Sequence, residues 1–178
     1  GKGIITSLEK HGGSFGRNIN AYTAQNETVY NLSDVPTNSE SLLDTCLLIL
    51  HDWSYYLTLE DDEIDAERGV ITEEWRTRRT PQFRIQKQMF PVLFKDSKYA
   101  IRDVIGNLDV IKNFKYQTIR DFYHEWYRTD LEAIAIVGDF DVAKMEQKVK
   151  ELFSKIPAVE NPTPRPFYEI PEHDEMYY

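Results

Sequence analysis

The chain has little of several features that would place it in a class at once. It has one cysteine, Cys46, which excludes an internal disulfide framework. No apolar run approaches the ~20 residues that a membrane-spanning helix needs. The chain also lacks a starting methionine and a signal-type leader with a basic and an apolar region. It begins at Gly1 and runs almost at once into a helical pattern. We therefore expect a piece of a longer protein.

The composition is that of an ordinary globular protein. The 178 residues are 41% hydrophobic and 29% charged, which argues against disorder and allows one buried core. The net charge of −9 argues against nucleic acid or an anionic membrane surface as a partner. With one cysteine, either the cytoplasm or the bacterial periplasm is compatible.

The order of the predicted elements favours an α+β domain. We expect a short helix over 4–11, a hairpin of strands over 18–24 and 27–35, helices over 39–53, 60–79 and 82–94, a loop-rich stretch over 95–115, a helix over 116–127, a strand over 131–137 and a last helix that Asp141 caps. These elements predict a mostly antiparallel sheet with helices packed on one face. Five prolines from Pro157 to Pro171 then predict that residues 158–178 form an extended linker toward a following domain.

The helix expected over 60–79 carries two carboxylates in the middle of an apolar stripe. Glu67 and Glu74 are seven residues apart, so they lie about 20° apart around the helix and two turns along it. Ile71 and Trp75 flank them, whereas Glu73 points well away from the stripe. Burying carboxylates in such a place is costly unless a cation compensates their charge.

That cation can be a side chain or a metal ion. Arg78 follows Glu74 by four residues near the same face, so a solvated strip of ion pairs is one interpretation, and a metal-binding or catalytic role is the other. Neither H-E-x-x-H nor H-x-x-E-H occurs, and carboxylates without imidazole are unlike a zinc site. The four histidines do not complete such a site: His11, His51, His124 and His173. From its residues alone, the chain therefore holds part of a possible site.

A second segment of interest runs over residues 12–23. Its glycines fit neither G-x-G-x-x-G nor a phosphate-binding loop, and no strand precedes them. The short polar strand that follows could be an exposed sheet edge, which can take up an extended peptide by β-augmentation. An ordinary hairpin strand is the alternative.

Three segments together resemble the pitrilysin/insulinase family of zinc metallopeptidases, and its long bacterial members in particular. They are LEKHGGSFGRNINAYTAQNETVYNLSDVP, DEIDAERGVITEEWR and FYHEWYRTDLEAIAIVGDFD. The resemblance implies a metallopeptidase half-domain of the pitrilysin type, with residues 1–157 as an incomplete N-terminal peptidase domain. By position in the ER…EEW motif, Glu74 corresponds to the third protein ligand of the zinc ion and Glu67 to a second functional acid near it. The strand that holds the substrate backbone in the family corresponds to Asn20 and Ala21, continued by Tyr22 and Thr23.

The sequence departs from the family where two zinc-binding histidines and the general base should stand, since the H-x-x-E-H helix is missing. We therefore expect part of a zinc metalloendopeptidase that hydrolyses peptides, with this chain inactive by itself and with the peptide substrate and the remaining domains of the parent chain as partners. Without the rest of the zinc site, Glu67 and Glu74 should be exposed or paired with arginines such as Arg78. The alternative is a non-catalytic binding or structural half-domain of the same fold. An unrelated acidic interaction domain would require both motif matches to be accidental.

Overall fold

The computed structural model describes residues 18–176, which divide into two compact units. Within the described residues, the first unit contains 18–23, 27–58 and 122–163, and the second contains 24–26, 59–121 and 164–176. The helix predicted over 4–11 and the glycines of residues 12–16 lie outside the described residues. No helix in the described part of the chain is long and apolar enough to cross a bilayer.

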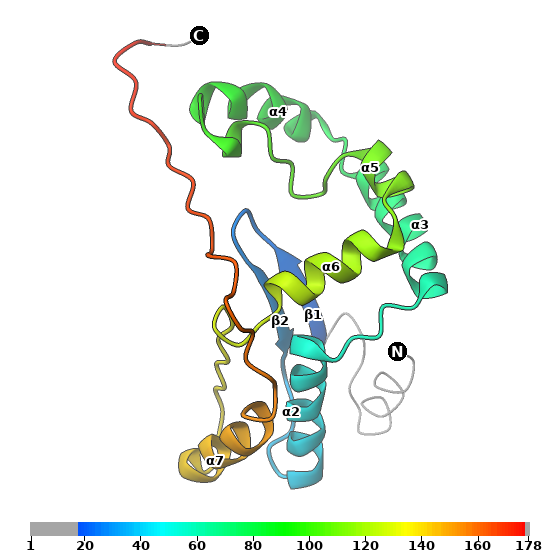
Figure 1. The fold of residues 1–178 in the computed structure, drawn as a ribbon, viewed down its shortest axis with the longest axis vertical. Helices are drawn as coiled ribbons and strands as arrows, with labels where there is room; N and C mark the ends of the chain where they lie inside the picture. The colour runs from blue at the N-terminus through cyan, green and yellow to red at the C-terminus, as the bar shows by residue number, and fades with distance from the viewer. Residues whose placement is uncertain (1–17, 177–178) are drawn as a thin grey trace. The chain divides into compact units, whose positions relative to one another are not determined.

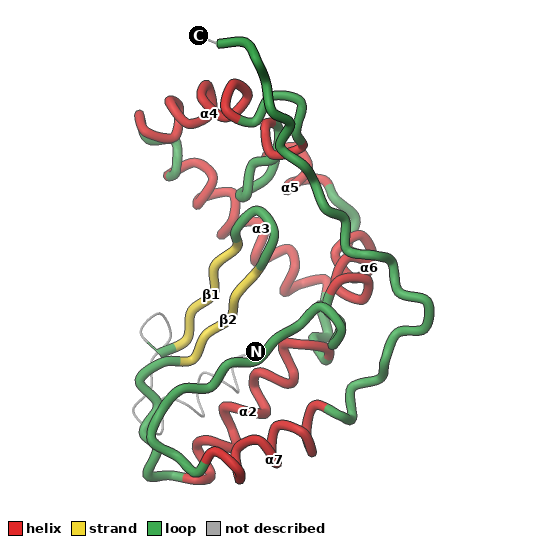
Figure 2. Tube along the Cα trace, turned by 90° about the vertical axis from the view of Figure 1, so that its left-hand side faces the viewer, coloured by secondary structure: helices red, strands yellow, loops and turns green. Residues whose placement is uncertain are grey.

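The first unit is built on a β-hairpin and two long helices. Its elements are β1 (Ile19–Thr23), β2 (Thr28–Leu32), α2 (Glu40–Tyr55), α7 (Val142–Phe153) and the end of α6 (Tyr116–Trp126). The strands are antiparallel, with Ile19 opposite Leu32 and Thr23 opposite Thr28 (Figure 2). The predicted hairpin is therefore confirmed, with its turn at residues 25–26.

The core of the first unit lies where the hairpin meets α2. Ser39 begins the helix, because its hydroxyl accepts a hydrogen bond from the Leu42 amide at 3.3 Å. The residues that pack together there are Ile19, Leu42, Cys46 and Ile49, with Leu32, Val35 and Trp53 partly buried against them. Cys46 is thus a small buried hydrophobe. In Figure 1, α7 lies beside α2, and Lys148 joins them through ion pairs to Glu40 (2.9 Å) and Asp44 (2.5 Å).

The second unit is helical. It contains α3 (Asp61–Thr77), α4 (Pro81–Leu93), the 3₁₀ turn η1 (Lys98–Ala100), α5 (Leu108–Asn113) and the start of α6. Thr80 caps α4 by accepting from the Phe83 amide at 3.2 Å, and Pro81 occupies the first turn, where its missing N–H costs nothing. The short α5 falls in the stretch that was expected to be loop-rich, since six residues are too few to establish a helical period.

The strand predicted over 131–137 is absent from the described structure. These residues form no strand, and Ile134 and Val137 are 38% and 97% exposed. A strand needs a hydrogen-bonded neighbour, and among the described residues only β1 and β2 pair. For the same reason the expected packing of helices on one face of a larger sheet is not confirmed, although the mixture of helices with an antiparallel sheet is. Residues 158–176 form no helix or strand.

Candidate functional site

Helix α3 carries both predicted carboxylates, and its ends suit the helix dipole. Its first turn holds Asp61, Asp62 and Glu63, and its last turn holds Arg76. The backbone N–H of Arg78 closes the helix on the carbonyl of Glu74 at 2.9 Å. Acidic residues in the first turn and Arg76 in the last turn therefore stabilise this helix through its dipole.

One face of α3 is anchored to α5. Ile64 of α3 is buried, and Arg68 donates to the carbonyl oxygens of Ile111 (2.6 Å) and Phe114 (2.5 Å). The guanidinium carbon of Arg68 also lies 3.7 Å from the centroid of the Phe114 ring, and its Nε donates to Asp65 at 3.0 Å. The planar fork of an arginine makes several bonds at once, so this one side chain fixes α5 against α3.

The face that carries Glu67 and Glu74 is open to solvent. Glu67 is exposed, the Glu74 side chain is 37% exposed, and Val70 between them is 58% exposed. Arg78 Nη2 lies 2.5 Å from Glu74 Oε1, an i,i+4 ion pair. Exposure and pairing with Arg78 are the two arrangements that the sequence predicts for these glutamates. The cost of burying a carboxylate does not arise at Glu67, and at Glu74, which is half-buried, the charge is paired with Arg78.

A complete metal site is not formed by the described residues. Nowhere in 18–176 do three His, Cys, Asp or Glu side chains lie close enough together to hold a metal ion. The carboxylate of Glu74 is a suitable donor for zinc and reaches solvent, so it can supply one ligand. The donor set does not fit a zinc ion without further ligands from outside the described residues.

The four predicted strand residues lie together on β1. Asn20, Ala21, Tyr22 and Thr23 are all exposed. Their strand pairs with β2 on one side, and among the described residues nothing pairs with its other edge. The Asn20 side chain accepts from the Ala21 amide at 2.9 Å. A strand edge without a partner strand can bind an extended peptide through its backbone groups, although the Ala21 N–H is already bonded to Asn20.

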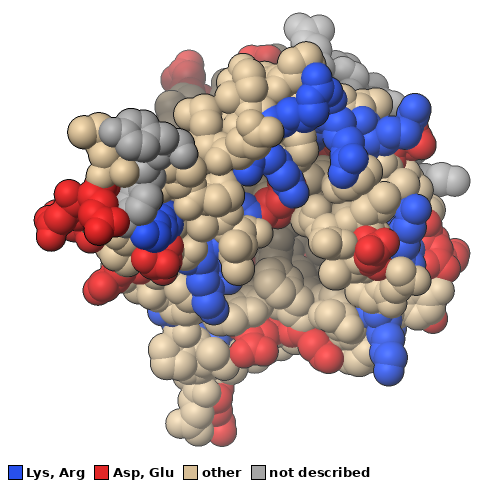
Figure 3. Space-filling model, turned by 90° about the horizontal axis from the view of Figure 1, so that it is seen from above, with Lys and Arg blue, Asp and Glu red and all other residues tan. Residues whose placement is uncertain are grey.

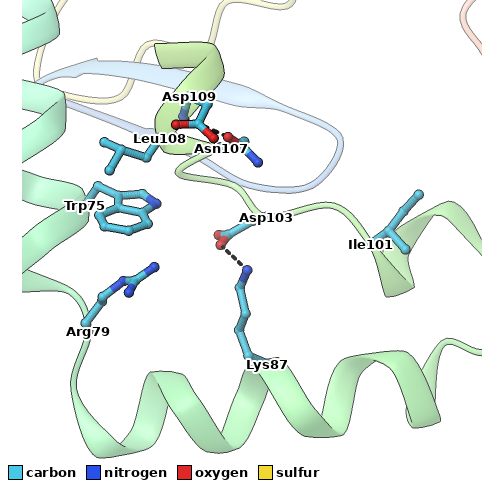
Figure 4. Close-up of a pocket in the computed structure, with 9 residues that line it drawn as sticks. Trp75, Arg79, Lys87, Ile101, Asp103, Asn107, Leu108 and Asp109 are labelled. Carbon is cyan, nitrogen blue, oxygen red and sulfur yellow. Dashed lines mark hydrogen bonds and ion pairs between the residues drawn. The ribbon is translucent and has the colours of Figure 1, made fainter. Parts of the chain in front are cut away.

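A pocket of about 420 Å³ in the second unit was not anticipated from the sequence. Figure 4 shows Trp75 and Arg79 on one side, Lys87 rising from α4, and Asp103 on the loop before α5. The Arg79 guanidinium carbon lies 3.6 Å from the centroid of the Trp75 ring, and Lys87 Nζ lies 3.6 Å from Asp103 Oδ2. The signal that could have revealed the pocket is the run of basic residues that follows Glu74.

Comparison with known proteins supports the resemblance found in the sequence. Residues 1–96, more than half of the chain, match the family model described as "Insulinase (Peptidase family M16)". Residues 113–177 match the model described as "Peptidase M16 inactive domain". The chain is 38% identical over 159 residues to "Probable zinc protease PqqL" of Haemophilus influenzae. That match covers 89% of this chain and 17% of the relative, so the chain spans about a sixth of its length.

Solved structures share the fold as well as the sequence. The first half of the periplasmic protease PqqL from Escherichia coli is 35% identical and superposes with a TM-score of 0.88, covering 98% of this chain and 36% of that one. A mutant of the ferredoxin protease FusC, solved in complex with Arabidopsis ferredoxin, is 31% identical with a TM-score of 0.84, covering 94% of this chain and 18% of that one.

Proposed function

The chain belongs to the insulinase family, peptidase family M16, and we propose that it forms part of a zinc-dependent metalloendopeptidase that hydrolyses peptides. The observation that carries this proposal is the ER…EEW segment on α3, where Glu67 and Glu74 lie two turns apart on a solvent-facing side of an anchored helix. The names of relatives such as the probable zinc protease of Haemophilus influenzae support the same chemistry.

In this proposal Glu74 is a zinc ligand and Glu67 is a second acid near the metal. Zinc, when bound, lowers the pKa of its water and polarises a carbonyl group. Arg78 Nη2 lies 2.5 Å from Glu74 Oε1, so it orients that carboxylate and neutralises its charge. The carboxylate of Glu67 is exposed and free to orient a group beside the metal.

The exposed edge of β1 is the proposed binding site for the backbone of the peptide substrate. Asn20, Ala21, Tyr22 and Thr23 supply this edge by forming a strand whose second side is open among the described residues. Main-chain hydrogen bonds to such an edge align a peptide without regard to its sequence. Specificity must then come from side-chain pockets.

By itself, the 178-residue chain should not hydrolyse peptides. Its sequence has no H-x-x-E-H, so two histidine ligands and a general base must come from elsewhere in the parent protein. A zinc titration of the chain tests this point. Stoichiometric binding at micromolar zinc, or cleavage of a peptide by the chain, would contradict it.

The experiment for the whole proposal is Glu74→Gln in the parent protein. We expect zinc content by mass spectrometry to fall and peptide cleavage to drop at least ~100-fold, because even residues that only support a ligand cost 10- to 100-fold. Glu73→Gln is the matched control, since Glu73 is its neighbour but pairs with Arg76 at 2.8 Å away from the proposed site. Unchanged zinc content in Glu74→Gln would reject the ligand assignment.

A second candidate is a non-catalytic half-domain of the same fold. The observation that favours it is the match of residues 113–177 to the family's inactive-domain model, together with the missing H-x-x-E-H. In that case the parent protein would bind no catalytic zinc through this domain. The zinc content of the unaltered parent protein, compared with Glu74→Gln, separates the two candidates.

A further inference from the structure

The corner between α3 and α4 is basic in a chain that is acidic overall. From Arg76 to Arg102 there are eight basic residues and one acidic residue, whereas the whole chain has a net charge of −9. Figure 3 views the molecule from the end at which Figure 1 shows α4, and blue basic side chains gather along one side of that face. Clustered charge of one sign attracts ligands of the opposite sign.

A groove of about 410 Å³ crosses this corner beside the pocket of Figure 4. We call it the basic groove, and its lining residues are Arg79, Phe83, Arg84, Lys87 and Gln88. Three cations and one aromatic ring line it, and no carboxylate does. The neighbouring pocket differs, because Asp103 and Asp109 there balance its two cations.

Two of the three cations have no carboxylate partner among the described residues. Lys87 pairs with Asp103 at 3.6 Å, but no ion pair of the described residues involves Arg79 or Arg84. Arg79 instead stacks on Trp75, and Arg84 Nη1 donates to the carbonyl oxygen of Arg79 at 3.5 Å. Their charges are therefore available to a ligand.

We propose that the basic groove binds an acidic segment of the polypeptide substrate. This inference rests on the proposed peptidase function. Guanidinium groups bind carboxylates through paired hydrogen bonds, and Phe83 offers an apolar contact to a neighbouring side chain. Arg79 lies five residues after Glu74, just beyond the last residue of α3, Thr77. The helix rises ~4.5 Å from Glu74 to Thr77, and two further residues span at most ~7 Å. An extended peptide advances ~3.3 Å per residue, so the acidic residue lies about two to four positions from the bond that is cleaved.

A polypeptide fits this groove better than a nucleic acid does. Two uncompensated cations match one or two carboxylates, whereas a polyphosphate is bound by a longer series of Lys and Arg contacts. The net charge of −9 would also repel a long polyanion beyond the groove. The occupant is therefore a short acidic stretch with an apolar side chain beside it.

The test compares two peptides and three forms of the parent protein. The peptides differ only in Asp and Glu replaced by Asn and Gln two to four positions from the cleaved bond. We expect the unaltered protein to show a kcat/KM roughly three- to tenfold higher for the acidic peptide, the range for one or two exposed charge pairs. Arg79→Gln with Arg84→Gln should remove this preference and leave cleavage of the neutral peptide within twofold. The control, Arg76→Gln, also loses one charge but lies outside the groove, so it should keep the preference.

Each outcome decides between the two proposals. Cleavage of both peptides at equal kcat/KM by the unaltered protein would overturn the proposed role of the basic groove and leave the peptidase function intact. If neither peptide is cleaved, the peptidase function fails, and fluorescence anisotropy of the labelled acidic peptide still tests the groove through loss of binding in the double variant. A DNA oligonucleotide of equal charge that displaces the acidic peptide at lower concentration than the unlabelled peptide does would also overturn the proposal.

Discussion

Helices α2 and α3 have nearly the same length but are used in different ways. The 16 residues of α2 include five that are buried, among them Leu47 and Ile49, and its apolar face forms the core of the first unit. The 17 residues of α3 include one buried residue, Ile64, and its anchorage to α5 depends on the bonds of Arg68. The first helix is covered by the hairpin, whereas the second presents two glutamates to solvent.

The difference shows which helix face the described residues cover and which they leave exposed. A helix that buries its apolar face is stabilised by tertiary packing, which is the main source of helix stability in proteins. On α3, Val70 and two carboxylates lie on one solvent-facing side, and that side is available to bind a ligand. We attribute that surface to the zinc site and to the substrate, as proposed above.

The largest effect on stability is expected in α2. Ile49→Ala removes a side chain that is 3% exposed, so it should lower the free energy of unfolding by about 2–4 kcal/mol. Val70→Ala in α3 should change it by less than ~0.5 kcal/mol, since that side chain is 58% exposed. Urea unfolding of the 178-residue chain measures both. Equal costs for the two variants would mean that α3 is buried in solution and would break the comparison.

The anchor of α3 should give the next largest effect. Arg68→Ala leaves two backbone carbonyls and the Phe114 ring without their partner, at a cost of about 1–3 kcal/mol. The loss should be local and should appear as faster hydrogen exchange of the amides of α5. Arg68→Lys keeps the charge but not the planar fork, so it should recover less than half of the protection. Full recovery by lysine would show that charge alone holds α5.

The sequence predicted these two helices with unequal success. For α2 the apolar spacing was enough to predict the helix, because the partner that covers it is a hairpin close by in the chain. For α3 the seven-residue spacing placed Glu67 and Glu74 on one face of a helix, and the structure confirms the helix. The spacing could not say what covers that face. The pocket lined by Trp75 and Lys87 was missed because it depends on a turn between two helices, which periodicity does not specify.

The strand predicted over 131–137 failed for a related reason. Its short apolar run is typical of a buried strand, yet pairing requires a neighbour that the described residues do not provide. The strand propensity of a segment depends on its own residues, whereas strand pairing depends on a second segment. The role of β1 as a substrate edge likewise stays a prediction, because an open edge is necessary for β-augmentation but does not identify the peptide.

The first unit contains Glu132, a partly buried carboxyl group whose ionisation destabilises the fold, in contrast to the glutamates of α3. Burial, with a smaller contribution from Asp130, raises the pKa of Glu132 to about 7. Folding therefore favours its protonated form, so its destabilising effect is absent below the ordinary pKa, grows as the pH rises toward 7 and is constant at higher pH. Glu132→Gln should be more stable than the unaltered chain by about 1 kcal/mol at pH 8, since solvent reaches part of the carboxyl group and lessens the cost of its charge, and equal to it at pH 4. A stability difference that does not change between thermal unfolding at pH 4 and pH 8 would contradict the burial of Glu132.

The smallest stability effect is expected at the proposed site itself. Glu74→Gln removes one exposed i,i+4 ion pair with Arg78, so the free energy of unfolding of the chain should change by at most ~0.5 kcal/mol. Glu67→Gln should change it even less, because no ion pair of the described residues involves Glu67 and its side chain is exposed.

Urea unfolding of the chain, set beside the zinc content of the parent protein, separates residues that support the fold from residues that bind the metal. Altering a residue that supports the fold lowers the free energy of unfolding. Altering a residue that only binds the metal lowers the zinc content and leaves the fold intact. A loss above ~2 kcal/mol in Glu74→Gln, well beyond the range of an exposed ion pair, would mean that its pair with Arg78 supports the structure, and α3 would then be a structural helix like α2.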